Sequence, residues 1–204
     1  MPLKSKTSFR RTKIYLMKIF LENAPSAASV LTLNAVVTEA IQDIGEGKRE
    51  VRVEHCEVGD QDIISLADCM KTSQSLEKFS LFFCSRQNQW GEIALRAIFS
   101  MLEANTTLTE LSFYGTRLHN AEVQVLAEAL SVNNTLKVLS LSGTTIGAEV
   151  KLALESALNT NTALEKLELA WSQNVGDGGV FLGKLIDTNR VGTELDLDNT
   201  VGGY

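Results

Sequence analysis

A pair of apolar residues separated by one residue recurs along the chain at a nearly fixed interval. Successive pairs lie 28, 32, 28, 28 and 28 residues apart. This short alternation predicts a strand at each pair. A lone strand and its following helix cannot bury their apolar faces, so the units must stack and share one core. The pairs are Val51/Val53, Phe79/Leu81, Leu111/Phe113, Leu139/Leu141, Leu167/Leu169 and Leu195/Leu197.

The segments that follow the strands have helical periodicity. Together with the strands, they predict that residues 48–204 form five full repeats and a terminal strand. Residues 1–47 contain two predicted amphipathic helices, 8–21 and about 27–44. Because the end of a solenoid needs a cover with a polar outer face, we interpret residues 1–47 as an N-terminal helical cap. The helices predicted in the repeats are Ile63–Met70, Ile93–Leu102, Val123–Leu130, Val150–Leu158 and Val180–Ile186.

Each repeat follows one consensus, which is clearest in residues 136–147. Its first, fourth and sixth positions are apolar, and its ninth holds a small polar residue or a cysteine. With a period of 28 residues, the pattern resembles the leucine-rich-repeat proteins of the ribonuclease-inhibitor-like class. The resemblance implies an α/β solenoid, a horseshoe arc with parallel strands inside and helices outside. The ninth-position residues are Cys56, Cys84, Thr116, Thr144, Ser172 and Thr200.

Within this class, residues 76–187 are also similar to the C-terminal domain of the tropomodulins. The similarity implies an actin-associated regulator of the cytoskeleton that caps actin filaments. Residues 1–47 show no match to the tropomyosin- and actin-binding half of that family, so the similarity is confined to the repeats. The segments that carry it are Met101–Leu111, Gly115–Arg117, Leu126–Leu130 and Asn133–Lys137.

A second resemblance concerns Arg86, in the turn after the second predicted strand. The Ran GTPase-activating proteins are leucine-rich-repeat proteins that place an essential arginine in an early strand-to-helix turn. The resemblance implies that Arg86 acts as an arginine finger in a GTPase-activating protein. The alternative is that Arg86 is a solvated loop charge.

The net charge of −6 conceals an asymmetry. Residues 1–20 contain six basic residues and no acidic one, whereas residues 21–204 contain 13 basic and 25 acidic residues. This acidic body argues against a nucleic-acid partner, which needs clustered Lys and Arg. The apolar stretch near the start is too short to span a membrane, so we predict no membrane partner. We expect a cytoplasmic protein, and the basic amphipathic segment 8–20 makes an organellar location the alternative.

Apart from the resemblance at Arg86, no combination of residues in the sequence suggests catalysis, and none suggests a metal site or a cofactor. His55 and His119 belong to different repeats, and neither has a matching nucleophile or ligand set. The three cysteines are widely spaced and form no CxxC motif, which favours a reducing compartment, with Cys69 in the core. The Asn-x-Thr sequences at Asn105 and Asn133 are expected to be helix-ending turns. We therefore predict a non-enzymatic scaffold that binds a protein.

The predicted binding site consists of side chains on the concave strand face and the adjacent rim. Exposed aromatic residues on a solvated sheet are favoured interface anchors. Phe83 and Trp171 have the alternative of packing beneath a turn. Trp90, which follows the turn with the four extra residues, is either a rim anchor or a helix-start residue packed inward. The predicted site residues are Phe82, Phe83, Tyr114, Trp171, Trp90, Arg52, Lys78, Glu168, Asp196 and Asp198.

The last predicted strand is acidic, with carboxylates at Glu194, Asp196 and Asp198. Charged residues on an edge strand discourage pairing with another chain. This strand is therefore either the complete C-terminal cap or an edge covered by a partner, by a further segment or by self-association. Its charge favours a basic region on the partner.

Overall fold

The computed structural model of the chain describes residues 33–54, 57–82, 90–115, 120–143 and 148–169 and the strand 194–196. The chain divides into two compact units, and every described residue belongs to the second, Leu33–Tyr204. The predicted helix 8–21 and the predicted helix 180–186 lie outside the described residues. So do all the ninth-position residues of the repeats, including Cys56 and Cys84.

Helices and strands alternate along the second unit, as the period of the apolar pairs predicts. The strands β1 to β3 contain both residues of their predicted pairs, whereas β4 to β6 contain the first residue and end before the second. The described helices of the repeats contain the predicted ones, but α2 begins only at Ala35, later than the predicted start near residue 27. The elements in chain order are α2 (Ala35–Gly45), β1 (Glu50–Glu54), α3 (Asp60–Thr72), β2 (Lys78–Phe82), α4 (Glu92–Ala104), β3 (Glu110–Tyr114), α5 (Asn120–Val132), β4 (Val138–Ser140), α6 (Ala148–Leu158), β5 (Lys166–Glu168) and β6 (Glu194–Asp196).

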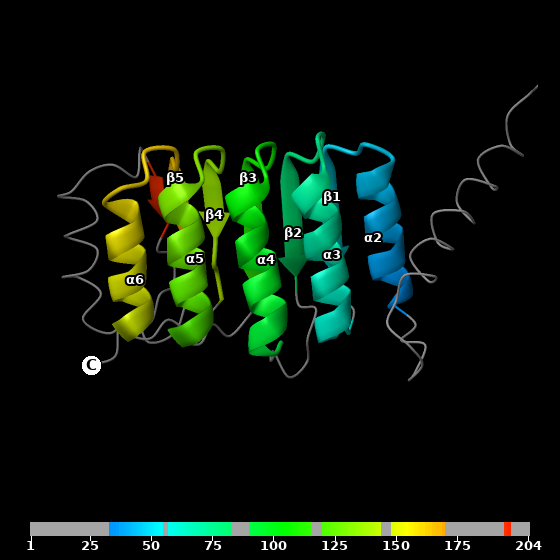
Figure 1. Ribbon diagram of the computed structural model, residues 1–204, viewed down its shortest axis with the longest axis horizontal. Helices are drawn as coiled ribbons and strands as arrows, with labels where there is room; N and C mark the ends of the chain where they lie inside the picture. The colour runs from blue at the N-terminus through cyan, green and yellow to red at the C-terminus, as the bar shows by residue number, and fades with distance from the viewer. Residues whose placement is uncertain are drawn as a thin grey trace, which may run out of the picture. The chain divides into compact units, whose positions relative to one another are not determined.

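The six described strands form one parallel sheet in chain order. Each strand pairs in register with the equivalent residues of the next, so Val51 lies beside Phe79 and Phe79 beside Leu111. Figure 1 shows the helices α2 to α6 side by side in one layer that covers one face of this sheet. Consecutive parallel strands need a crossover connection of a dozen or more residues, and the helices between the strands provide it.

The core lies between the helix layer and the sheet. The central strand residues Val53, Phe79, Leu111, Leu139 and Leu167 all have a relative exposure of 0%. Burying a side chain of this size stabilises the fold by about 1.5–3 kcal/mol. Every repeat adds such residues to the same continuous cluster, so no repeat has a separate core of its own.

A ladder of buried asparagines joins the repeats where each helix ends. Asn105, Asn133 and Asn161 are 3%, 4% and 2% exposed. The Asn133 Nδ2 donates to Leu102 O of the preceding repeat at 2.8 Å. The Asn133 Oδ1 accepts the backbone N–H groups of Thr135 and Leu136 at 3.0 and 2.8 Å.

The other two asparagines repeat this geometry. The Asn105 Nδ2 donates to Met70 O at 2.7 Å, and the Asn161 Nδ2 donates to Leu130 O at 2.6 Å. One amide thus satisfies a helix-end carbonyl of one repeat and two turn N–H groups of the next, and buried groups of this kind need such partners. The prediction that Asn105 and Asn133 mark helix-ending turns is confirmed.

The four extra residues of the second repeat leave this stacking unchanged. Strands β2 and β3 pair in the same register as β1 and β2, although their pairs are 32 residues apart. At the end of the same repeat, after α4, the Asn105 side chain still donates to Met70 O, and Thr107 Oγ1 donates to Ser73 O at 3.2 Å. The extra length therefore falls between Phe82 and Trp90, within the turn after β2, as predicted.

The helix α2 packs on the first repeat through hydrogen bonds at its N-terminus. Asn34 Oδ1 caps the helix by accepting the Val36 N–H at 2.9 Å. The Asp62 carboxylate accepts the N–H groups of Asn34 and Gly59, both at 2.9 Å, so it caps α3 and holds α2 at once. Cys69 packs against the core, as predicted, and its thiol donates to Ile41 O of α2 at 3.8 Å.

We expect Asn133→Ala to lower the free energy of unfolding by about 2–3 kcal/mol, because it leaves Leu102 O and two backbone N–H groups buried without partners. Urea unfolding followed by circular dichroism measures the change. The control is Asn134→Ala at the neighbouring, exposed asparagine, where a change of about 0.5 kcal/mol or less is expected. Equal effects of the two substitutions would contradict a role for the ladder.

Candidate functional site on the open face of the sheet

The face of the sheet away from the helix layer, here called the open face, carries three rows of residues. Because successive strand residues point to opposite faces, every second residue of each strand lies on it. The charged row consists of Glu50, Lys78, Glu110, Val138, Lys166 and Glu194. The serine row consists of Arg52, Ser80, Ser112, Ser140, Glu168 and Asp196. The aromatic row consists of Glu54, Phe82 and Tyr114.

Ion pairs connect the basic residues of this face to its carboxylates. Lys78 Nζ pairs with Glu110 across β2 and β3. The hydrogen bond to Glu110 raises the pKa of Lys78 above its ordinary value. Arg52 pairs with Glu50 at 2.7 Å, and Lys166 pairs with Glu168 at 3.0 Å. The described basic side chains of the open face are thus all in ion pairs with neighbours on the same face.

The serine row lies between the charged row and the aromatic row, and most of its central side chains are short. Ser80 and Ser112 are half-buried, and Ser140 and Ser142 are 6% and 7% exposed. The hydroxyls of Ser140 and Ser142 lie 3.3 Å apart, within hydrogen-bond distance. Small side chains at these positions leave the backbone of the sheet close to the surface.

The aromatic row carries the largest side chains of the described open face, Phe82 and Tyr114. The rings of Phe82 and Tyr114 are half-buried and stacked, with centroids 6.1 Å apart and an interplanar angle of 27°. The Tyr114 ring also lies against Gly143, where a Cβ would come within 3.4 Å of the ring. Gly143 has φ +69°, a conformation that glycine adopts without strain. A side chain at this position of the turn after β4 would therefore crowd the Tyr114 ring.

The structure places five predicted site residues on the open face, and their role in binding stays a prediction. These residues are Arg52, Lys78, Phe82, Tyr114 and Glu168. The strand β6 brings Asp196 into the serine row by its register, and nothing more is described of its side chain. Phe83, Trp171 and Asp198 lie outside the described residues, as do His55, His119 and Arg86.

Trp90 is not a rim anchor. It is 7% exposed, and its indole N–H donates to Val58 O at 2.9 Å. The next residue, Gly91, donates its N–H to Asp60 Oδ1 at 2.8 Å. A Cβ on Gly91 would lie 2.5 Å from the other Asp60 oxygen, so the chain passes close to α3 here. Trp90 therefore packs inward at the start of α4 and fastens the second repeat to the first, as the alternative interpretation expected.

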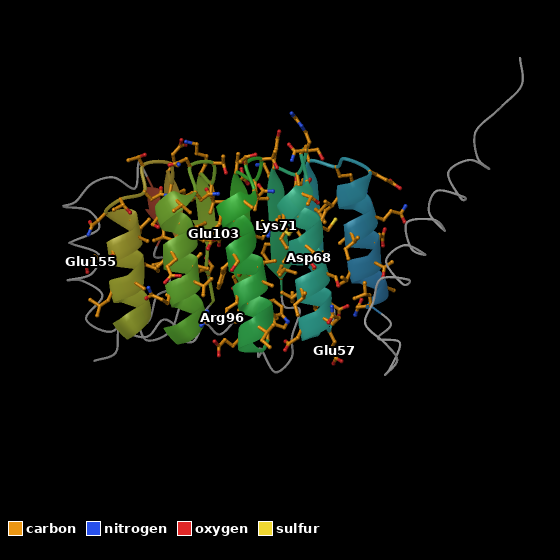
Figure 2. All side chains as sticks on the ribbon, in the orientation of Figure 1. Glu57, Asp68, Lys71, Arg96, Glu103 and Glu155 are labelled. Atoms are coloured by element: carbon orange, nitrogen blue, oxygen red, sulfur yellow. The ribbon has the colours of Figure 1, made fainter. Side chains whose placement is uncertain are left out.

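The opposite side of the unit, formed by the helix layer, also carries charged side chains. Figure 2 shows Asp68, Arg96 and Glu103 on the helix layer, away from the sheet. Among the described residues, no group of three or more His, Cys, Asp and Glu side chains could hold a metal ion. None of the described helices is both long and apolar enough to cross a membrane.

Comparisons with known proteins match this geometry. The sequence profile described as "Leucine Rich repeat" matches residues 132–149, from the end of α5 to the start of α6. The structure is similar to that of the actin-binding site 2 of leiomodin-1, with 19% identity, a TM-score of 0.58 and coverage of 80% of this chain and 94% of that one. It is also similar to the tropomodulin C-terminal domain of Caenorhabditis elegans, with 18% identity, a TM-score of 0.59 and coverage of 75% and 92%.

The fold is a leucine-rich-repeat solenoid. The predicted fold class and the predicted similarity to the tropomodulin C-terminal domain are both confirmed. At these identities, the two solved structures establish the shared fold and no more. A comparison with curated proteins gave no significant match.

The burial of Trp90 in the solenoid predicts how it responds to a quencher. In the variant Trp171→Phe, Trp90 is the remaining tryptophan, because the chain has two. We expect its fluorescence to resist quenching by acrylamide, since its ring is 7% exposed. Unfolding in urea serves as the control and should make quenching efficient. Efficient quenching of the folded variant would show that Trp90 is at the surface after all.

Proposed function

We propose that the protein is a non-enzymatic scaffold that binds another protein through the open face of its sheet. The observation that supports this most directly is the stacked Phe82–Tyr114 pair, which lies half-exposed on a face that no described helix covers. Partly exposed aromatic rings on a rigid surface are favoured anchors, because they bury a large area and lose little conformational freedom on binding. A surface displayed by a parallel sheet changes shape little, which lowers the entropic cost of association.

The composition of the face favours a protein partner over other classes of ligand. It combines an aromatic pair, paired charges and small hydroxyls, the mixture of an apolar centre and a polar rim that protein interfaces have. Clustered unpaired basic residues, which nucleic-acid binding needs, are absent from its described part, since its three basic side chains are in ion pairs. The acidic residues of β6, Glu194 and Asp196, favour a basic region on the partner.

The double variant Phe82→Ala/Tyr114→Ala should lose the partner that the wild-type protein captures from a lysate of its source cells. The loss should be at least tenfold, because each aromatic anchor contributes about 1 kcal/mol or more to binding. Bound proteins are compared by quantitative mass spectrometry.

The matched control is Ile93→Ala/Leu152→Ala, which removes two apolar side chains from the helix layer, where they are 73% and 64% exposed. This control should retain the partner. Thermal unfolding verifies that both variants are folded. Equal capture by the wild-type protein and the Phe82/Tyr114 variant would exclude the open face as the binding site.

An actin-associated role is a second candidate for the same scaffold. The observation that favours it is the fold shared with the leiomodin-1 domain, whose name records actin binding, over 94% of that domain. The tropomodulin C-terminal domain shares the fold over 92% of its length. Actin would then be the protein that the open face or its rim contacts.

If actin is the partner, the protein should sediment with actin filaments in the ultracentrifuge or slow elongation at a filament end. The Phe82/Tyr114 variant should do so less, and the Ile93/Leu152 variant should behave as the wild type. If the wild-type protein neither sediments with filaments nor alters their growth, the actin role is wrong, whereas the scaffold role remains open to the capture experiment.

A further inference from the structure

The aromatic row ends in a carboxylate at β1. Glu54 is the register partner of Phe82, and Phe82 is the register partner of Tyr114. Glu54 is exposed, and the two rings are half-buried. Because neighbouring strands are about 4.8 Å apart, the carboxylate and both rings lie within reach of one long side chain.

Among the open-face carboxylates whose side chains are described, Glu54 is the one with no ion pair to another described residue. Glu50 pairs with Arg52, Glu110 with Lys78, and Glu168 with Lys166. Just before the strands, Arg49 pairs with Glu77 at 3.0 Å, and Lys137 with Glu165 at 2.9 Å. Among residues that the structure describes, no such partner exists for Glu54. Within the described part of the open face, the carboxylate without an ion-pair partner is thus the one beside the aromatic pair.

This combination fits a guanidinium group. The faces of aromatic rings attract cations within about 6 Å of the ring centroid. A planar guanidinium can stack on a ring and donate a pair of hydrogen bonds to a carboxylate at the same time, which an ammonium cannot. Ser80 and Ser112, which lie two residues before the rings on β2 and β3, have small side chains that obstruct an approaching segment little.

We propose that the aromatic row binds an arginine side chain in an extended segment of the partner protein, with the guanidinium stacked on Phe82 and Tyr114 and paired with Glu54. This inference rests on the proposed function, because it uses the same face. It adds the chemistry that the face recognises, and it assigns Glu54 a role in selecting the partner.

Selection of random heptapeptides displayed on phage against the immobilised full chain tests the proposal. The enriched peptides should share an arginine at one position. A synthetic peptide of the enriched sequence should bind Glu54→Gln about threefold to tenfold more weakly than the wild type, as measured by fluorescence anisotropy. Replacing the shared arginine with neutral citrulline should weaken binding by a similar factor, and combining both changes should cause little further loss.

The control is Glu103→Gln on the exposed face of α4, which changes the net charge by the same amount on the helix layer. It should leave the affinity for the peptide unchanged. Selection against Glu54→Lys should no longer enrich arginine and should favour Asp or Glu at that position. Circular dichroism verifies that each variant is folded.

Four results would overturn the inference. They are enrichment of peptides without a shared arginine, no enrichment at all, equal affinity when lysine replaces the arginine, and equal weakening by Glu54→Gln and Glu103→Gln. Peptides that lack arginine but fail to bind the Phe82/Tyr114 variant would overturn this inference and leave the proposed function standing. Peptides that bind the Phe82/Tyr114 variant as well as the wild type would count against both.

Discussion

The buried asparagine amide is the interaction on which the regularity of this protein depends. A strand and a helix joined by two turns leave backbone N–H and C=O groups inside the stack, and water cannot reach them. Asn105, Asn133 and Asn161 satisfy these groups from the interior and connect each repeat to the one before it. Because each amide fixes one repeat against its neighbour, equivalent residues of successive strands lie side by side. The rows of the open face follow from this alignment.

Most of the solenoid could be predicted from the sequence, because its local and repeated signals agree. The apolar pairs predict the position of every described strand, and the 3.6-residue periodicity predicts the described helices of the repeats, although not the start of α2 at Ala35. The helix ends were less predictable: α3 and α4 extend one to three residues beyond the apolar positions, where mostly polar residues complete the first and last turns. The recurrence of asparagine at 105, 133 and 161 was visible in the sequence, but its two-sided bonding depends on contacts between repeats.

The candidate site was predictable in outline and not in detail. Alternation alone placed Phe82 and Tyr114 on the open face, because the apolar residues that alternate with them along β2 and β3 had to face the core. Trp90 could not be assigned in this way, since it follows a turn of irregular length where no periodicity indicates a direction. That Glu54 has no ion-pair partner among the described residues depends on which charges pair across and along the strands. That pairing is a property of side-chain geometry, and the sequence shows only that the charges exist.

The second repeat separates two quantities that usually change together, the length of a repeat and its alignment with its neighbours. Its four additional residues alter neither the strand register nor the bonds at the helix ends. The rim and the open face can therefore diversify independently over evolution. A lineage of such proteins can acquire new rim loops while keeping an old sheet surface, or alter the sheet surface beneath unchanged loops.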